Sequence, residues 1–333
     1  MKTTIDQLCP DIWQYVFEYF HARELFTSLI HVTKAADDVL LNENQHFSAR
    51  TLVIDTVVRT PPKELMPARV ISLELYEDSR FNTIRQYFQL RSLKLIGDPQ
   101  WIIYVLKQIS QNNKRLEQLT FLIPSIGFLY DLLASISVIS SLRRLEIRAD
   151  QFEEKIKVPS SFVRLAKIEQ FILHSCSSIS WNELLYMSPH MSNVRFLDIT
   201  LIKCHNNLLN SFTLPKLRSL FLILIEIPFE LIIQLVTTAP SLVKLKLNGL
   251  VDEQGFVINH KWSKLFESCS SLKSIIVSVS LEQSISSYYS ETIRESLHRI
   301  NLTLNVFDDD SEYYLDTRQQ NHWWKLSGVI IQH

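Results

Sequence analysis

Glycine is scarce in this chain, with 5 residues among 333, and its scarcity excludes several classes of protein. Phosphate-binding loops and dinucleotide-binding folds need glycine-rich turns, and neither G-x-x-x-x-G-K-[ST] nor G-x-G-x-x-G occurs. Cysteine is also rare. The four cysteines (Cys9, Cys176, Cys204 and Cys269) form no C-x-x-C pair, which predicts a reducing compartment, the cytoplasm or the nucleus.

Neither strong charge nor a long apolar run is present. The formal net charge of −1 argues against binding to nucleic acid, which needs a basic face. The densest apolar stretch, LFLILIEIPFELIIQLV, is interrupted by Glu226, Pro228 and Glu230, so it falls short of the roughly 20 residues of a membrane helix. We therefore expect no membrane segment, and the acidic residues near the N-terminus argue against a signal peptide.

Sequence patterns typical of catalysis are missing too. No G-x-S-x-G or H-E-x-x-H occurs, and the two close His/Cys pairs, His174 with Cys176 and Cys204 with His205, lack a second ligand pair at zinc spacing. We expect no metal, no cofactor and no catalytic residue. An unrecognised enzyme in an α/β frame remains the least favoured alternative.

What the chain does contain is a repeat with the pattern L-x-x-L-x-L. It starts at nine positions: Val70, Leu90, Leu116, Leu142, Ile168, Val194, Leu217, Leu242 and Leu272. Five consecutive starts, from Leu90 to Val194, are each 26 residues apart, and a weaker candidate at Ala49 would make ten units. A repeat of 20 to 30 residues is the signature of a solenoid, in which stacked units share one core.

Each repeat predicts a short strand followed by a helix. The apolar positions at the end of the motif alternate with variable residues, which is the period of a strand with one buried face. Segments of helical pattern lie between the strands: WIIYVLKQISQN, GFLYDLLASISV, WNELLYMSPHM, PFELIIQLVTTA and KWSKLFESC. On these motifs the chain resembles the leucine-rich repeat family, with ribonuclease-inhibitor-like units. The resemblance implies an α/β solenoid over residues 47–306 with a cap or tail over 307–333.

The N-terminal stretch LCPDIWQYVFEYF lies outside the repeat and has apolar residues on more than one helical stripe. Together with the following ELFTSLIHVTKAADDVLL, it predicts two or three short helices. This N-terminal region resembles an F-box. The resemblance is carried by Leu8 and Pro10, by the aliphatic and aromatic helix after them, and by Leu25, Leu29, Val32 and Lys34. Residues 1–46 would then form an all-helical F-box module, although the tryptophan usual after the basic residue is absent. The alternative is a plain N-terminal cap for the solenoid.

An F-box followed by leucine-rich repeats implies the substrate-recognition subunit of a Skp–cullin–F-box ubiquitin ligase, a non-catalytic adaptor. The F-box would bind a Skp-type adaptor and, through it, a cullin. By resemblance, six residues would make the adaptor contacts: Leu8, Pro10, Ile12, Phe17, Phe20 and Leu25. The rival hypothesis is a leucine-rich repeat scaffold or inhibitor that binds a protein without any ubiquitin link.

The repeat strands also predict where a protein substrate would bind. Positions between the inward leucines should line the concave face, where apolar residues in mid-sheet are flanked by charges, the usual anatomy of a protein-binding site. The candidate substrate-binding residues are Arg144, Glu146, Ile172, Phe196, Asp198, Phe221, Lys244 and Lys246. The alternative is that a loop or the C-terminal tail buries this apolar patch.

Overall fold

The computed structural model describes residues 5, 8–17, 19–20, 24–29, 31–41, 52–54, 67–77, 84–110, 114–150, 165, 167–175, 179–202, 213–251, 254–281, 295–298, 302–307 and 323–331. The chain forms two compact units, residues 1–159 (unit 1) and 160–333 (unit 2). The division into segments 1–46, 47–306 and 307–333 stays a prediction.

Unit 1 begins with three short helices that share a small core. They are α1 (Pro10–Phe17), the π-helix η2 (Leu25–Leu29) and α3 (Lys34–Leu41). α1 packs against α3, and the rings of Trp13 and Phe17, one helical turn apart, are buried with centroids 5.3 Å from each other. The hydroxyl of Thr33 accepts a hydrogen bond from the amide of Ala36 and so caps α3.

The rest of unit 1 is a parallel sheet with helices and turns between the strands. In spatial order its strands are β1 (Leu52–Ile54), β2 (Ser72–Tyr76), β3 (Ser92–Ile96), β4 (Gln118–Ile123) and β5 (Arg144–Ala149). The connections include 3₁₀ turns η3 (Pro67–Arg69) and η4 (Ile84–Gln86) and helices α4 (Pro99–Ser110) and α5 (Leu129–Ile136).

Unit 2 continues the same pattern and ends in antiparallel strands. Its parallel strands are β6 (Gln170–Ser175), β7 (Ile179–Ser180), β8 (Phe196–Ile202), β9 (Ser219–Ile225), β10 (Lys244–Val251) and β11 (Ser274–Leu281). Its helical elements are α6 (Trp181–Met187), η5 (Ser188–His190), α7 (Phe229–Thr237), η6 (Gln254–Val257) and α8 (Asn259–Glu267). Beyond β11 lie β13 (Trp323–Ile331) and then β12 (Leu302–Phe307), both paired antiparallel.

All nine predicted repeats contain a strand that starts two residues after the motif begins. Neighbouring strands pair equivalent motif positions, as in Leu73 with Leu93 and Leu93 with Leu119 in unit 1. In unit 2, Leu220 likewise lies between Leu197 and Leu245. The prediction of an α/β fold with one parallel strand in each repeat is therefore confirmed.

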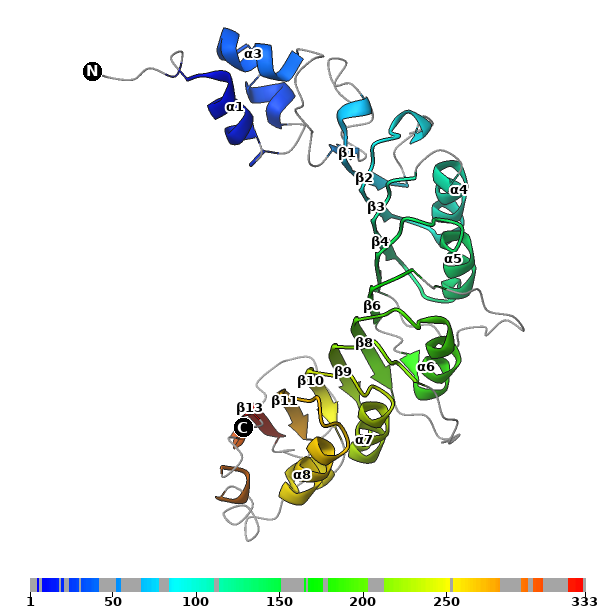
Figure 1. Cartoon of the computed structure of the whole chain (residues 1–333), viewed down its shortest axis with the longest axis vertical. Coiled ribbons are helices and arrows are strands. Elements are labelled where there is room, and N and C mark those ends of the chain that lie inside the picture. Colours follow the sequence, from blue (N-terminus) through cyan, green and yellow to red (C-terminus); the bar gives the residue numbers. More distant parts are fainter. Residues whose placement is uncertain are drawn as a thin grey trace, which may run out of the picture. The chain divides into compact units, whose positions relative to one another are not determined.

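Burial alternates along these strands because helices cover only one face of each unit's sheet. In Figure 1, α4 and α5 lie on one side of the unit 1 strands, and α6, α7 and α8 lie on one side of the unit 2 strands. Leucines such as Leu220 and Leu222 point to the helices and are buried, whereas Phe221 and Ile223 between them are only half-buried. We call the second face of unit 2, opposite its helices, the unit-2 open face.

Backbone hydrogen bonds add a fixed link between successive repeats. At the start of a strand, two consecutive amides donate to one carbonyl of the previous repeat, as Arg218 and Ser219 do to Arg195, at 2.8 and 3.0 Å. Lys273 and Ser274 do the same to Val243. Because the link uses only main-chain atoms, it tolerates any residue except proline at the donor positions, which is consistent with the variability of the motif there.

One of the few glycines is required by close packing between strands. Gly249 in β10 has a φ of +112°, and a Cβ at this position would lie 2.2 Å from the carbonyl oxygen of Leu224 in β9. Only glycine fits such an approach. Among the described residues, no helix has both the length and the apolar character needed to cross a membrane.

Candidate functional site

Three neighbouring strands of unit 2 place a cluster of aromatic and charged side chains on its open face. In one cross-strand row, Asp198 of β8 is opposite Phe221 of β9, which in turn is opposite Lys246 of β10. In the adjacent row, Phe196 and Lys244 flank Ser219. Because equivalent positions of consecutive repeats are in register, residues 23 to 25 apart in the sequence become direct neighbours.

The centre of this cluster is a pair of phenylalanine rings. Phe196 and Phe221 meet edge to face, with ring centroids 5.0 Å apart. The ammonium groups of Lys244 and Lys246 lie 5.7 and 5.5 Å from the centroid of the Phe221 ring, within the range of cation–π interactions. An apolar surface of this kind beside two cations can take up a partner that offers both an apolar and an anionic group.

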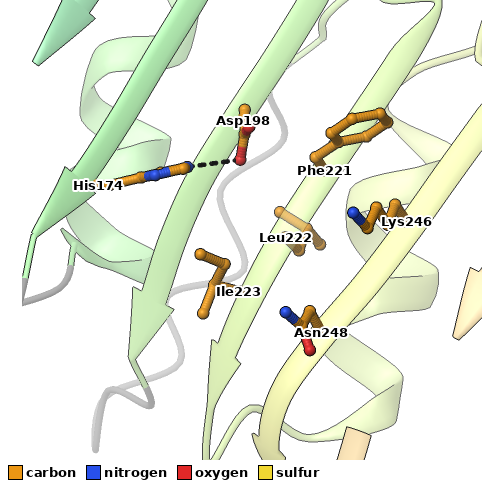
Figure 2. Close-up of a pocket in the computed structure, with 7 residues that line it drawn as sticks. All are labelled: His174, Asp198, Phe221, Leu222, Ile223, Lys246 and Asn248. Carbon is orange, nitrogen blue, oxygen red and sulfur yellow. Dashed lines mark hydrogen bonds and ion pairs between the residues drawn. The ribbon is translucent and has the colours of Figure 1, made fainter. Parts of the chain in front are cut away.

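A histidine–carboxylate pair borders the cluster on the β6 side. Nε2 of His174 lies 2.7 Å from Oδ1 of Asp198, and both side chains are partly exposed. Figure 2 shows the two groups pointing at one another across the gap between their strands. The contact satisfies one oxygen of Asp198 and fixes the position of the imidazole ring.

A small pocket opens among these side chains. Its volume is about 120 Å³. The residues that line it come from β6, β8, β9 and β10: His174, Asp198, Phe221, Leu222, Ile223, Lys246 and Asn248 (Figure 2). Sites for drug-sized ligands typically measure about 300 to 1,000 Å³, so this pocket fits a side chain better than a cofactor.

In unit 1 the sheet face opposite the helices has a different character, because its charges are paired. Glu146 accepts hydrogen bonds from Arg144 at 3.0 Å and from Arg148 at 2.8 Å. Glu74 likewise contacts Lys94 at 3.1 Å and the hydroxyl of Tyr76 at 2.9 Å. The charged groups of these two clusters therefore satisfy one another within unit 1.

The environment of Glu146 determines its ionisation. Burial alone would raise the pKa of its carboxyl, but hydrogen bonds and positive charge from Arg144 and Arg148 outweigh burial and leave the pKa below its ordinary value. Glu146 therefore stays ionised, and its two arginine partners hold it in a single arrangement. A substrate that contacted this carboxylate would have to compete with both.

The predicted substrate-binding residues thus fall into two groups. Phe196, Asp198, Phe221, Lys244 and Lys246 come together on the unit-2 open face. Arg144 and Glu146 belong to the separate ionic cluster of unit 1. Ile172, expected in the exposed apolar patch, is only 7% exposed. It packs within unit 2 and offers little surface to a partner.

The predicted adaptor-binding residues also divide by burial. Phe17 and Leu25 are 1% and 0% exposed, because they form the core of the N-terminal helices. Pro10, Ile12 and Phe20 are exposed and Leu8 is half-buried. Of the six predicted contacts, Ile12 and Phe20 are the large apolar side chains that remain exposed, at 45% and 37%.

Two further aromatic residues enlarge that surface. Tyr15 and Tyr19 are 62% and 71% exposed, and their hydroxyl groups are 2.8 Å apart. Neither tyrosine is among the contacts that the F-box resemblance predicts, although their spacing from Ile12 places them on the outer side of α1 and the turn after it.

His174 and Asn248 were also missed as members of the site. Each occupies the next alternate position of its strand, two residues beyond Ile172 and Lys246 respectively. Extending the period-2 pattern by one step along each strand would have found both. The sequence singles out His174 only through its spacing from Cys176, as one of two close His/Cys pairs.

No group of three or more His, Cys, Asp or Glu side chains that could hold a metal ion occurs in the part of the chain that the structure describes. Cys176, Cys204 and His205, the other members of the two close His/Cys pairs, lie outside the described residues. Cys9 is exposed and Cys269 is buried, and both are free thiols.

No protein-family model matches the chain, and no curated protein matches it. Among solved structures, the leucine-rich repeat-containing protein LegL7 from Legionella pneumophila aligns over 74% of this chain and 96% of its own length, with 12% sequence identity and a TM-score of 0.30. The repeat architecture of this chain, with one parallel strand per repeat, rests on its own strand register and pattern of burial.

Proposed function

We propose that this protein is a receptor that binds a protein partner on the unit-2 open face and docks on a Skp-type adaptor through its N-terminal helices. The single observation that carries the first half is the Phe196–Phe221 pair, half-buried on a sheet face opposite the helices and bordered by two lysines. Aromatic side chains at the centre of a patch with a charged rim are typical of protein interfaces.

The adaptor half of the proposal is supported by the N-terminal helices. Their inner face supplies Trp13 and Phe17 to a small core, while Ile12, Tyr15 and Phe20 remain exposed. An apolar surface on so small a module is the kind that a partner chain covers. The F-box-like sequence LCPDIWQYVFEYF gives that partner a class, the Skp-type adaptors.

In this proposal the chain performs no chemical step. A cullin and a ubiquitin-conjugating enzyme would be recruited through the adaptor, and a substrate held on the unit-2 open face would meet them at high effective concentration. The protein would act in the cytoplasm or nucleus. Its specificity would come from the residues of the open face and its link to ubiquitin transfer from α1.

The test of the adaptor half is copurification with a purified Skp-type adaptor. We expect the full chain to retain the adaptor and the double variant Ile12→Ser/Phe20→Ser to lose it, because both side chains are exposed and their loss should leave the fold intact. Tyr104→Ser is the matched control, since Tyr104 is an aromatic residue of unit 1 with 61% exposure but lies on α4. Failure of the unaltered chain to bind any Skp-type adaptor would remove the ligase hypothesis.

The second candidate function is a repeat scaffold or inhibitor with no ubiquitin link. It is favoured by the burial of Phe17 and Leu25, two residues that the F-box resemblance assigns to the adaptor interface. Under this alternative, the unaltered chain captures a protein partner from extract but no adaptor. Phe196→Asp would then abolish capture of the partner, as it would under the first proposal.

A further inference from the structure

The two lysines of the unit-2 open face have no carboxylate to neutralise them among the described residues. The ammonium groups of Lys244 and Lys246 both lie over the ring of Phe221, and neither takes part in an ion pair with any described side chain. The contrast with unit 1 is clear, since Lys94 pairs with Glu74 at 3.1 Å on the equivalent positions of β3 and β2.

The carboxylate that belongs to the cluster is engaged through one of its oxygens. Asp198 is in the same cross-strand row as Phe221 and Lys246, but its carboxylate contacts His174 at 2.7 Å. The Phe221 ring therefore lies between an acidic group that His174 engages through one oxygen and two cations with no acidic partner among the described side chains. A partner that brought its own carboxylate would find the attraction of the two lysines uncompensated.

The pocket beside Lys246 offers a further donor to such a partner. Oδ1 of Asn248 accepts a hydrogen bond from the amide of Gly249 at 3.0 Å, which turns the NH₂ group of the side chain the other way. In Figure 2 this nitrogen and the Lys246 ammonium both point toward β9, which carries Phe221 and Ile223. Two donors thus converge on an apolar floor within a pocket of about 120 Å³.

We propose that the unit-2 open face recognises an acidic peptide segment that carries an aromatic side chain. Its carboxylates would bind Lys244, Lys246 and the Asn248 amide, and its ring would stack against Phe196 and Phe221. This inference rests on the proposed protein-binding function of the same face. Carboxylate suits the site better than phosphate, because no arginine lines the pocket to form the bidentate contacts that phosphate recognition favours.

The direct test is binding of short fluorescent peptides to the full chain, followed by fluorescence anisotropy. The probe is the acetylated peptide EEFDE. The comparison peptides are QQFNQ, which lacks the charge, EESDE, which lacks the ring, and a version of QQFNQ with one phosphoserine. We expect saturable binding of EEFDE, weaker binding of EESDE and no binding of the other two. Raising the salt should weaken the EEFDE complex, because its charged contacts are at the surface.

Variants assign the binding to the site. Lys244→Gln and Lys246→Gln should each weaken EEFDE about tenfold, the effect expected for losing one hydrogen bond to a charged group. Lys273→Gln is the matched control: Lys273 is exposed in unit 2 and precedes β11, outside the cluster. It should change the affinity by less than about twofold, and all three variants should melt at the temperature of the unaltered chain.

Several results would overturn the inference. Equal binding of EEFDE and QQFNQ, equal loss in Lys273→Gln and Lys246→Gln, or binding of the phosphorylated peptide alone would each contradict it. So would EEFDE binding that appears only when Asp308, Asp309 and Asp310 are changed to Asn, because the chain's own acidic segment would then be the occupant. None of these outcomes affects adaptor copurification or the loss of partner capture in Phe196→Asp, so the proposed function is tested separately.

Discussion

At the scale of single residues, the two units differ in whether the charged side chains on the sheet face opposite the helices are paired. Glu146 has two arginine partners, and its pKa lies below the ordinary value because their hydrogen bonds and charge outweigh the effect of burial. Lys244 and Lys246 instead lie over an aromatic ring with no acidic partner among the described residues. Paired charges serve the stability of a repeat protein, and unpaired charges on an apolar patch suit recognition.

The first prediction concerns Glu146→Gln. At neutral pH the change should lower the free energy of unfolding by about 1 kcal/mol, less than the usual effect of a hydrogen bond to a charged group, because Arg144 and Arg148 remain partly solvated. Because the pKa of Glu146 is lowered on folding, its contribution is present above the ordinary value of 4.5 and is lost as the pH falls through the lowered pKa. Urea unfolding at several pH values measures both effects.

In this experiment the difference in stability between the unaltered chain and Glu146→Gln should shrink as the pH falls below 4.5. A difference that stays constant down to pH 3 would mean that the ionised carboxylate contributes nothing specific. Glu117→Gln serves as a control, because Glu117 is also in unit 1 but is exposed.

At the scale of elements, α6 begins with a capping box made of two reciprocal hydrogen bonds between Ser180 and Glu183. The Ser180 hydroxyl accepts a hydrogen bond from the Glu183 amide at 3.3 Å, and the Glu183 carboxylate accepts one from the Ser180 amide at 2.7 Å. Burial raises the pKa of Glu183, and the hydrogen bonds from Ser180 lower it only in part. The cap therefore carries a partly buried acid that folding makes harder to ionise.

The second prediction follows from that balance. Ser180→Ala should lower the free energy of unfolding by about 1 kcal/mol, the usual effect of losing an N-cap side chain, whereas Ser263→Ala in the interior of α8 should be close to neutral. Glu183→Gln keeps an acceptor for the Ser180 amide. Below pH 4.5 it should match the unaltered chain, and above the raised pKa of Glu183 it should be at least as stable.

The sign of the Glu183 effect is opposite to that of Glu146. A pKa raised on folding gives stabilisation that is present below 4.5 and lost as the pH rises through the raised value. Thermal melts of Glu183→Gln at pH 4 and pH 7 distinguish the two cases. Lower stability of Glu183→Gln at pH 7 would contradict the assignment, because it would show that the ionised form is favoured.

At the scale of the whole molecule, a repeat protein has to protect the ends of its sheets. In unit 2, β13 pairs with β11 along eight residue positions, from Ser274 with Ile331 to Leu281 with Trp324, and runs antiparallel to the repeat strands. An uncovered parallel edge strand is a template for association with other chains. β13 thus covers the edge of β11 by antiparallel pairing, whereas the repeat strands pair in parallel.

The third prediction is that removing residues 321–333 will expose this edge. The truncated chain should form oligomers or precipitate, because β11 would present unpaired main-chain groups beside a buried hydrophobic face. Size-exclusion chromatography with light scattering measures the outcome. A chain lacking only residues 332–333 is the matched control, and a truncated chain that stays monomeric with unchanged melting would contradict the role assigned to β13.

Much of the fold could be predicted because the repeat is visible in the sequence as a recurring L-x-x-L-x-L motif. Each L-x-x-L-x-L motif has only a few residues between its inward leucines, so strand position and register follow from local pattern. The unit-2 cluster could be predicted in part for the same reason. The pairing of Glu146 with two arginines and the burial of Ile172 could not be predicted from the sequence. Both depend on how neighbouring side chains, two residues apart on one strand or one repeat apart on adjacent strands, pack against each other.

The amino-acid sequence by itself determined the periodic α/β architecture, because a 26-residue period with alternating leucines can bury its apolar face only by stacking strand on strand. Tertiary structure alone decided which charges remain available. Lys94 and Lys246 occupy equivalent motif positions, yet Lys94 meets Glu74 on the neighbouring strand and Lys246 meets Phe221. The identity of the cross-strand neighbour, not the motif, makes one lysine structural and leaves the other for a partner.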